Sequence, residues 1–240
     1  MRIISGKHKG RRLVAPKNLP VRPTTDMCKE SLFNILNNYF NFHGLKVLDL
    51  FAGTGNISYE FASRGAGPIT SVDGDMGCVN FIKKTATELD LDISVIKSDV
   101  FKFLEKSKAN YDVIFADPPY DLSQENFEKI IQLIFENELL DEEGMLIVEH
   151  SKHTKLDHLT NFSFSKSYGG SVFSFYEFES DEEEDFEDAY KTAKAEAKAC
   201  FGDDDMYLDV LESLYLLDYL DKSLDTVINN FKIVKVTDGK

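Results

Sequence analysis

Short apolar runs alternate with longer amphipathic stretches along most of the chain, which is the pattern of an α/β fold with a parallel sheet. Five runs predict buried strands, at residues 46–48, 69–73, 93–97, 111–116 and 144–150. Apolar residues at helical spacing predict helices within 26–40, 56–62, 78–89, 101–104 and 123–138. Strands separated by helices in this way form a sheet in which the carboxyl ends of the strands share one edge.

The two ends of this alternation have different patterns. Residues 162–166 and 172–178 alternate with period two around a pair of glycines, which predicts a closing antiparallel hairpin. Residues 2–5 and 12–15 are short strand candidates around a glycine-containing turn, which predicts an N-terminal β-hairpin. We therefore divide the chain into a basic hairpin and loop (1–24), a main domain (25–178) and an acidic linker with a helical tail (179–240).

The segment before the first long helix is rich in proline, which excludes regular structure there. Thr25 or Asp26 is placed to cap the helix that follows. The apolar face of this helix has seven members, Met27, Leu32, Phe33, Ile35, Leu36, Tyr39 and Phe40. We interpret this face as packing against the sheet.

Charge is distributed unevenly along the chain. The net charge is −15, and residues 179–240 hold 18 acidic and 7 basic residues, which accounts for −11 of that total. The first 30 residues carry eight bases against two acids. A block of acids is typical of a solvated segment, while the leucines at 208–220 predict a helix of unknown role behind it.

The sequence does not indicate a membrane span, a disulfide framework or a metal site. No apolar run approaches the ~18 residues of a membrane span, and the first residues lack an apolar signal region. Three cysteines lie far apart and fit neither a disulfide framework nor a zinc ribbon. The spacing of His150, His153 and His158 matches no strong metal site. We therefore expect a reduced, cytoplasmic protein without a metal and without membrane contact.

A glycine-rich turn follows the first predicted strand of the main domain. Its candidate ligand contacts are Asp49, Phe51, Gly53 and Gly55. Ligands of open α/β sheets bind at such turns, because glycine lets a ligand touch the backbone. Ser58 stands where the dinucleotide fingerprint has its third glycine, so the turn favours a nucleotide-like ligand without a pyrophosphate. A plain turn between a strand and a helix, without a ligand, is the alternative.

Acids follow the next two predicted strands and are expected on the same edge. Asp73 ends the second strand, where a carboxylate accepts hydrogen bonds from ribose hydroxyls, and Asp75 is the runner-up. Asp99 follows the third strand and is placed to accept from the exocyclic amine of adenine, with the backbone N–H of Val100 beside it. A helix N-cap is an equally compatible interpretation of Asp99.

The sequence Asp117-Pro118-Pro119-Tyr120 directly follows the fourth predicted strand. Its two prolines make a rigid loop that holds one carboxylate and one aromatic ring at the strand tip. S-adenosylmethionine fits the glycines and acids of this edge, since it is an adenosine with a phosphate-free tail. The loop at 117–120 then stands where the methyl group of this ligand points.

Basic residues gather near the start of the chain, at Lys7, Lys9, Arg11, Arg12 and Arg22. Clustered Lys and Arg supply most of the affinity of a protein for a polyanion, so we interpret these residues as phosphate contacts to a polyanion. A solvated loop is the alternative.

These motifs together resemble those of the RsmD family, the 16S ribosomal RNA guanine-N2 methyltransferases. The resemblance covers residues 1 to about 178, and is carried by 2–6, 9–11, 22–26, 30–34, 49–55 and 117–120. It implies a Rossmann-like class I methyltransferase fold with a seven-stranded, mostly parallel sheet. The implied reaction is methylation of a guanine N2 amine in 16S rRNA, within a small ribosomal subunit or an assembly intermediate.

Other functions remain open. An adenine-N6 methyltransferase of DNA or RNA shares the chemistry of the loop at 117–120, but it would need a target-reading domain where only an acidic tail is spare. A protein glutamine methyltransferase carries Asn at the position of Asp117. A binding protein that acts through its acidic tail has no need of Asp117 and Tyr120. The tail is outside the family pattern, and its partner is either an unknown protein or the basic arm in cis.

Overall fold

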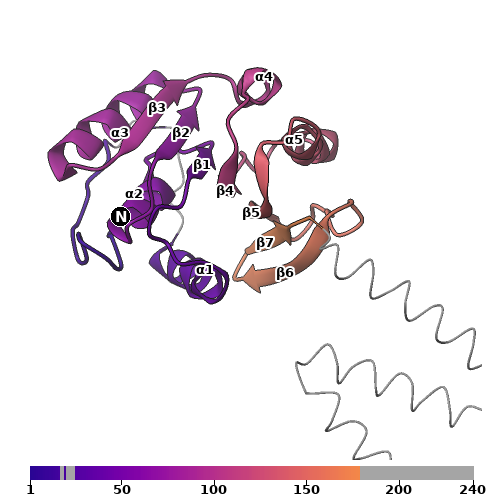
Figure 1. Cartoon of the computed structure of the whole chain (residues 1–240), viewed down its shortest axis with the longest axis horizontal. Helices are drawn as coiled ribbons and strands as arrows, with labels where there is room; N and C mark the ends of the chain where they lie inside the picture. The colour runs from indigo at the N-terminus through magenta and orange to yellow at the C-terminus, as the bar shows by residue number, and fades with distance from the viewer. Residues whose placement is uncertain (17–18, 20–24, 179–240) are drawn as a thin grey trace, which may run out of the picture. The chain divides into compact units, whose positions relative to one another are not determined.

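The computed structural model describes residues 1–16, 19 and 25–178. The predictions for Arg22, for the acidic linker and for the helical tail lie outside the described residues. The described part is an α/β fold, with one sheet between two layers of helices (Figure 1).

Seven strands form a single sheet in the order β3-β2-β1-β4-β5-β7-β6. Their bounds are β1 Val47–Leu50, β2 Ile69–Asp73, β3 Ile93–Lys97, β4 Tyr111–Ala116, β5 Leu140–Ser151, β6 Phe162–Tyr168 and β7 Ser171–Tyr176. Pairings from β3 to β5 are parallel, whereas β7 runs antiparallel to both β5 and β6. The predicted fold class and its closing antiparallel hairpin are confirmed.

Five helices belong to the described part, α1 before β1 and the other four between successive strands from β1 to β5. Their bounds are α1 Asp26–Tyr39, α2 Asn56–Ser63, α3 Met76–Leu89, α4 Val100–Lys106 and α5 Gln124–Glu136. None of these helices is long and apolar enough to cross a membrane.

The order of the strands reverses between β1 and β4. The chain moves outward through β1, β2 and β3, and then returns so that β4 pairs with the other side of β1. Leu50 lies opposite Val72 on one side and Ala116 on the other. The carboxyl ends of these strands therefore meet at one edge of the sheet, which we call the rim. Ligands of open α/β sheets bind at such a reversal.

Helices cover both faces of the sheet, which explains why every residue of β1 is buried. Leu104 of α4 and Ile130 of α5 pack on one face. Phe33 of α1 and Phe61 of α2 pack on the other face, and α3 joins them there through Ile82. Figure 1 shows these two layers on opposite sides of the strands.

The first helix begins as predicted but is rotated relative to its expected apolar face. The side chain of Thr25 accepts a hydrogen bond from the backbone N–H of Cys28 at 3.2 Å. Met27 and Tyr39 were expected to be buried, and this was wrong, since they are 64% and 52% exposed. The buried stripe includes Cys28 and Lys29 instead. Successive helical residues differ by about 100°, so Met27 points away from the stripe that begins at Cys28.

Residues 1–16 contain no regular strand, but backbone hydrogen bonds between Met1 and Leu13 and between Ile3 and Arg11 join the two arms of the expected hairpin. Among the described residues of this segment, a single bridge pairs Arg2 with Arg12. The turn between them docks on the end of α2, where a Cβ added to Gly6 would lie 1.7 Å from the carbonyl oxygen of Ser63. Backbone groups of the segment are bound by α2 as well as by each other, so a full ladder of strand pairs does not form.

Candidate active site

The glycine turn, residues 51–55, leaves β1 at the rim and leads directly into α2. Three of its residues have positive φ angles, Phe51 at 58°, Gly53 at 55° and Gly55 at 75°. Glycine adopts this conformation freely, whereas it costs a residue such as phenylalanine about 1–3 kcal/mol. A Cβ at Gly55 would also lie 2.9 Å from the ring of Tyr59. Gly55 is therefore required by the fold itself, and the strain at Phe51 marks the turn as a candidate functional site.

Asp49 supports this turn from the interior of the sheet. The residue is 1% exposed, and its carboxylate accepts hydrogen bonds from the Ser58 hydroxyl and, at 3.1 Å, from the Ser58 backbone N–H. The same hydroxyl lies 2.7 Å from Oγ of Ser71 in β2. Burial raises the pKa of Asp49 to about 7. Ser58, at the place of the missing third glycine, thus ties α2 to two strands, and Asp49 is buried below the rim.

Asp73 closes the rim beside the glycine turn. Its two carboxylate oxygens accept hydrogen bonds from the backbone N–H groups of Gly53 and Asp75, each at 2.7 Å. Burial raises the pKa of Asp73, and these two hydrogen bonds oppose that shift. Asp75 has a separate task, because it caps α3 by accepting from the backbone N–H of Cys78 at 2.9 Å. A carboxylate oxygen has two lone pairs, so Asp73 retains acceptor capacity at the turn.

Asp99 lies at the end of β3, next along the same edge, and is exposed. Its Oδ1 accepts from the backbone N–H of Lys102 at 3.0 Å, so Asp99 is the N-cap of α4. The side chain of Val100 is buried in the core below it. Capping uses only one carboxylate oxygen, so the predicted role toward a ligand stays compatible with it.

The loop after β4, which we call the proline loop, comprises Asp117, Pro118, Pro119 and Tyr120. The backbone N–H of Asp117 donates to the carbonyl oxygen of Leu50 at 3.4 Å, directly before the glycine turn. Pro118 is buried, Asp117 is half-buried, and Tyr120 is 47% exposed. The Tyr120 hydroxyl lies 3.2 Å from Oγ of Ser171 in β7. The loop therefore presents one carboxylate and one exposed aromatic ring beside the glycine turn.

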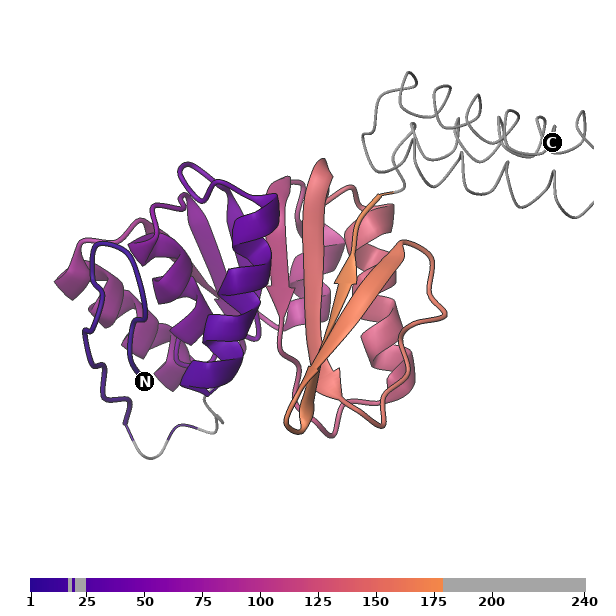
Figure 2. The ribbon, with the colours of Figure 1, turned by 90° about the horizontal axis from the view of Figure 1, so that it is seen from below.

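The structure places Lys7, in the basic turn of the N-terminal segment, away from the rim. The four described basic candidates, Lys7, Lys9, Arg11 and Arg12, are exposed. The backbone N–H of Lys7 donates to Ser63 at 2.7 Å, and its ammonium lies 3.9 Å from Asp90. Ser63 and Asp90 lie at the carboxyl ends of α2 and α3, and the eight residues of α2 span about 12 Å. Figure 2 shows the indigo segment running past the helices at the left of the view.

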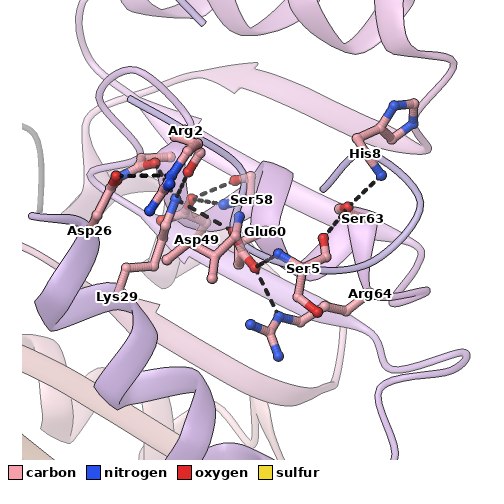
Figure 3. A network of polar contacts seen from close by, with 12 residues as sticks. Arg2, Ser5, His8, Asp26, Lys29, Asp49, Ser58, Glu60, Ser63 and Arg64 are labelled. Carbon is pink, nitrogen blue, oxygen red and sulfur yellow. Dashed lines mark hydrogen bonds and ion pairs between the residues drawn. The ribbon is translucent and has the colours of Figure 1, made fainter. Parts of the chain in front are cut away.

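A buried polar network, which the sequence analysis did not identify, links the N-terminal segment to the glycine turn (Figure 3). Lys29 of α1 has no exposed surface. Its ammonium donates to the carbonyl oxygen of Arg2 at 2.7 Å and to Oδ1 of Asn56 at 2.8 Å. It also lies 3.4 Å from Oε2 of Glu60, which is equally buried. Asn56 is the first residue of α2, so Lys29 contacts the helix immediately behind the turn.

Glu60 completes this network from the middle of α2. Its carboxylate accepts from the backbone N–H groups of Ile4 at 2.8 Å and Ser5 at 3.0 Å, and from Nε of Arg64 at 3.0 Å. Burial lowers the pKa of Lys29, and the charge of Glu60 opposes that shift. The signal that sequence analysis could have used is a lysine inside the apolar stripe of α1, which calls for a buried anion as its partner.

The histidines of the described part do not form a metal site. The His150 ring lies 2.7 Å from Oγ of Ser174 and 2.9 Å from the carbonyl oxygen of Ser151, and burial lowers its pKa. His158 pairs with Glu128 at 3.5 Å. No group of three His, Cys, Asp or Glu side chains that could hold a metal ion occurs among the residues described.

The groups at the rim fit an adenosine ligand that lacks phosphates. Residues 49–59 contain no Lys or Arg that would balance a pyrophosphate. Asp73 lies beside the glycine turn with acceptor capacity for hydroxyl groups, and Asp99 follows on the next strand. The proline loop lies on the other side of the same turn, so a ligand and a second reactant can meet there.

This strand order, with an antiparallel last pairing, is that of the class I methyltransferases, and solved structures share it. A hypothetical protein of Thermus thermophilus, TTHA0928, is 25% identical with a TM-score of 0.65, over 74% of this chain and 99% of that one. Two curated relatives are named Ribosomal RNA small subunit methyltransferase D. The Haemophilus influenzae protein is 32% identical over 180 residues, 73% of this chain and 91% of its own. The Escherichia coli K12 protein is 31% identical over 189 residues, 77% and 93% of the two chains.

The family model described as Conserved hypothetical protein 95 matches residues 1–177. The chain belongs to this family, the RsmD family of methyltransferases, as the sequence motifs predict.

Proposed function

We propose that this protein transfers a methyl group from S-adenosylmethionine to the exocyclic N2 amine of a guanine in small-subunit ribosomal RNA. The observation that carries the proposal is the hydrogen bond from the backbone of Asp117 to Leu50. It joins the proline loop to the strand that ends in the glycine turn, so a group bound at the turn and a base bound at the loop are neighbours.

The residues that would hold the methyl donor lie along the rim. Gly53 and Gly55 would face its amino-acid part, Asp73 would accept from its ribose hydroxyls, and Asp99 with Val100 would face its adenine. S-adenosylmethionine, when bound, supplies an electrophilic methyl group on a positively charged sulfur. Asp49 supports the turn through its hydrogen bonds with Ser58. Phe51 is the first residue of the turn and has a positive φ angle.

The proline loop supplies the chemistry toward the base. A guanine 2-amino group is a poor nucleophile because its lone pair is delocalised into the ring. Asp117 and the carbonyl of Pro118 would accept its two N–H hydrogens, which favours a pyramidal nitrogen and frees the lone pair. Tyr120, which is 47% exposed, would stack on the base and hold it in this position. Such positioning supplies up to ~7–11 kcal/mol in favourable cases.

The names of the relatives support ribosomal RNA of the small subunit as the substrate. The target base must leave its stack to reach the proline loop, which is bonded to Leu50 of β1 and to Ser171 of β7. The substrate in the cell would be 16S rRNA in a small subunit or an assembly intermediate, in the cytoplasm. Lys7, Lys9, Arg11, Arg12 and Arg22 would bind the RNA backbone, and Lys7, at the far end of α2, would do so at a distance from the target base.

The test is methyl transfer from labelled S-adenosylmethionine to small-subunit rRNA, compared between the wild type, Asp117→Ala and Asp121→Ala. We expect Asp117→Ala to lose at least 99% of the activity while its affinity for S-adenosylhomocysteine stays within threefold. Asp121 is the exposed acid directly after the loop, so Asp121→Ala should retain activity. Equal activity of Asp117→Ala and the wild type would contradict the proposed role of the loop.

A further inference from the structure

The turn between β6 and β7, residues 168–171, lies at the rim, although these are the last two strands in the order of the sheet. Ser151 at the end of β5 pairs with Ser171 at the start of β7, so the turn extends from the edge where the parallel strands end. The Tyr120 hydroxyl, 3.2 Å from Oγ of Ser171, joins the turn to the proline loop. The turn is thus a wall of the site on the side away from the glycine turn.

The two glycines of this turn are not equally required by the fold. Gly169 has a φ of +63°, which favours glycine, whereas the φ of Gly170 lies outside the left-handed range. A two-residue hairpin turn of this kind needs glycine only at its first central position. A Cβ added to either residue meets no atom within 4 Å. Neither backbone conformation nor packing within the described chain therefore explains why residue 170 has no side chain.

The neighbouring loop after β5 places cationic side chains next to this turn. Lys152 and Lys155 are exposed, and Asp157 is the acid that follows them. The loop is held in place by Gln124, whose Oε1 accepts from the backbone N–H of Lys155 at 3.2 Å and whose amide donates to the Lys155 carbonyl. Gln124 begins α5, four residues after Tyr120. The turn at 168–171 is thus bonded to the proline loop itself, and the loop after β5 is bonded to the helix that follows the proline loop.

We infer that the turn at 168–171, with Lys152 and Lys155, is an RNA-contacting surface that takes the nucleotides next to the target base. This inference rests on the proposed function. Lys7, in the predicted basic turn, is bound at the far end of α2, about one helix length from the rim, so it is too far to hold the flanking nucleotides itself. At residue 170 a strand of RNA can approach the backbone closely, because no Cβ projects there. The two ammonium groups would meet its phosphates.

The test uses the full chain with two variants, Gly170→Leu, which adds volume, and Lys152→Glu/Lys155→Glu, which reverses charge. We expect each to lower kcat/KM for small-subunit rRNA at least tenfold while the affinity for S-adenosylhomocysteine stays within twofold. The charge variant should also have a shallower salt dependence of RNA binding. The controls are Asn110→Leu and Lys108→Glu, exposed residues just before β4 at the opposite edge, which should keep wild-type activity.

The outcomes separate the inference from the proposed function. If the wild type methylates rRNA and both rim variants match it within twofold, the surface inference is wrong and the proposed function stands. If the wild type transfers no methyl group to rRNA or to assembled subunits, both are overturned. If Gly170→Leu unfolds, the charge variant alone decides, since exposed charges contribute little to stability.

Discussion

Replacing Lys29 with methionine would remove the cation of the buried network while keeping the length and most of the volume of the side chain. Glu60 would remain fully buried and would lose the ammonium that lies 3.4 Å from it, leaving Arg64 as its one cationic partner within the described network. The acceptors on Arg2 and Asn56 would lose a donor as well. Breaking a buried ion pair by removing one partner typically costs about 3–5 kcal/mol, because the other charge stays buried.

The assay is urea unfolding at pH 7 together with the thermal midpoint of the full chain. A domain of this size loses about 2–4 °C in Tm per kcal/mol, so Lys29→Met should lower Tm by roughly 6–20 °C. The matched control is Lys84→Met, since Lys84 is exposed and pairs with Glu88 at 3.8 Å along α3. An exposed pair of this kind contributes about 0.3–0.5 kcal/mol, so the Tm and the free energy of unfolding of the control should hardly change.

A second substitution tests the reasoning further. Glu60→Gln added to Lys29→Met removes the buried carboxylate charge, but an amide has only one oxygen for the two backbone N–H groups of Ile4 and Ser5. The double variant should therefore recover only part of the lost stability. If Lys29→Met alone stays within about 1 kcal/mol of the wild type, the network does not stabilise the fold as described.

Three further predictions concern the pH response, the base-binding ring and the tail. Asp49 has a pKa of about 7 in the folded protein against 3.8 as the ordinary value, so its contribution to stability is present below pH 3.8 and is lost as the pH rises to 7. The free energy of unfolding of Asp49→Asn should therefore fall less than that of the wild type as the pH rises from 4 to 8, measured by urea unfolding of both proteins. Tyr120→Ala should lower kcat/KM for rRNA about 5–150-fold, the equivalent of ~1–3 kcal/mol of base stacking, whereas Tyr120→Phe should stay within threefold. Deletion of residues 179–240 should tighten RNA binding at equal salt if the acidic tail competes for the basic arm, and an unchanged Kd would remove that proposal.

The parts of the fold that sequence could predict depend on local patterns. The apolar runs of the parallel strands are bounded by turns. Two of these runs lead into a motif, the first into the glycine turn and the fourth into the proline loop. Placing these two motifs on one rim needed only the rule that parallel strands share their carboxyl edge. The structure bears this out through the hydrogen bond between Asp117 and Leu50.

Other features depend on contacts between distant segments, which one sequence does not reveal. The burial of Lys29 follows from Glu60, and the docking of Gly6 on Ser63 carries the basic turn to the opposite edge from the rim. The face of α1 was misjudged at Met27 for a related reason. Its apolar residues cover more of the helix than the sheet can bury, and tertiary packing selects the stripe.

Asp49 shows how a residue can be correctly placed and have an unexpected task. Its position at the end of β1 was predicted from the motif, and a contact to the ligand was expected there. Its carboxylate is instead bound by Ser58, which stands where a dinucleotide-binding turn has glycine. The exchange of glycine for serine and the burial of Asp49 are thus one feature, and only the structure connects them.

Nucleoside analysis of small ribosomal subunits that lack this methyl mark, after incubation with the full chain and labelled S-adenosylmethionine, would show which base is methylated. We expect labelled N2-methylguanosine, and its loss in Asp117→Ala with cofactor binding retained. Labelled N6-methyladenosine would contradict the guanine assignment and place the protein among adenine methyltransferases. The absence of any labelled nucleoside from subunits, naked rRNA and DNA, despite cofactor binding, would contradict the account as a whole.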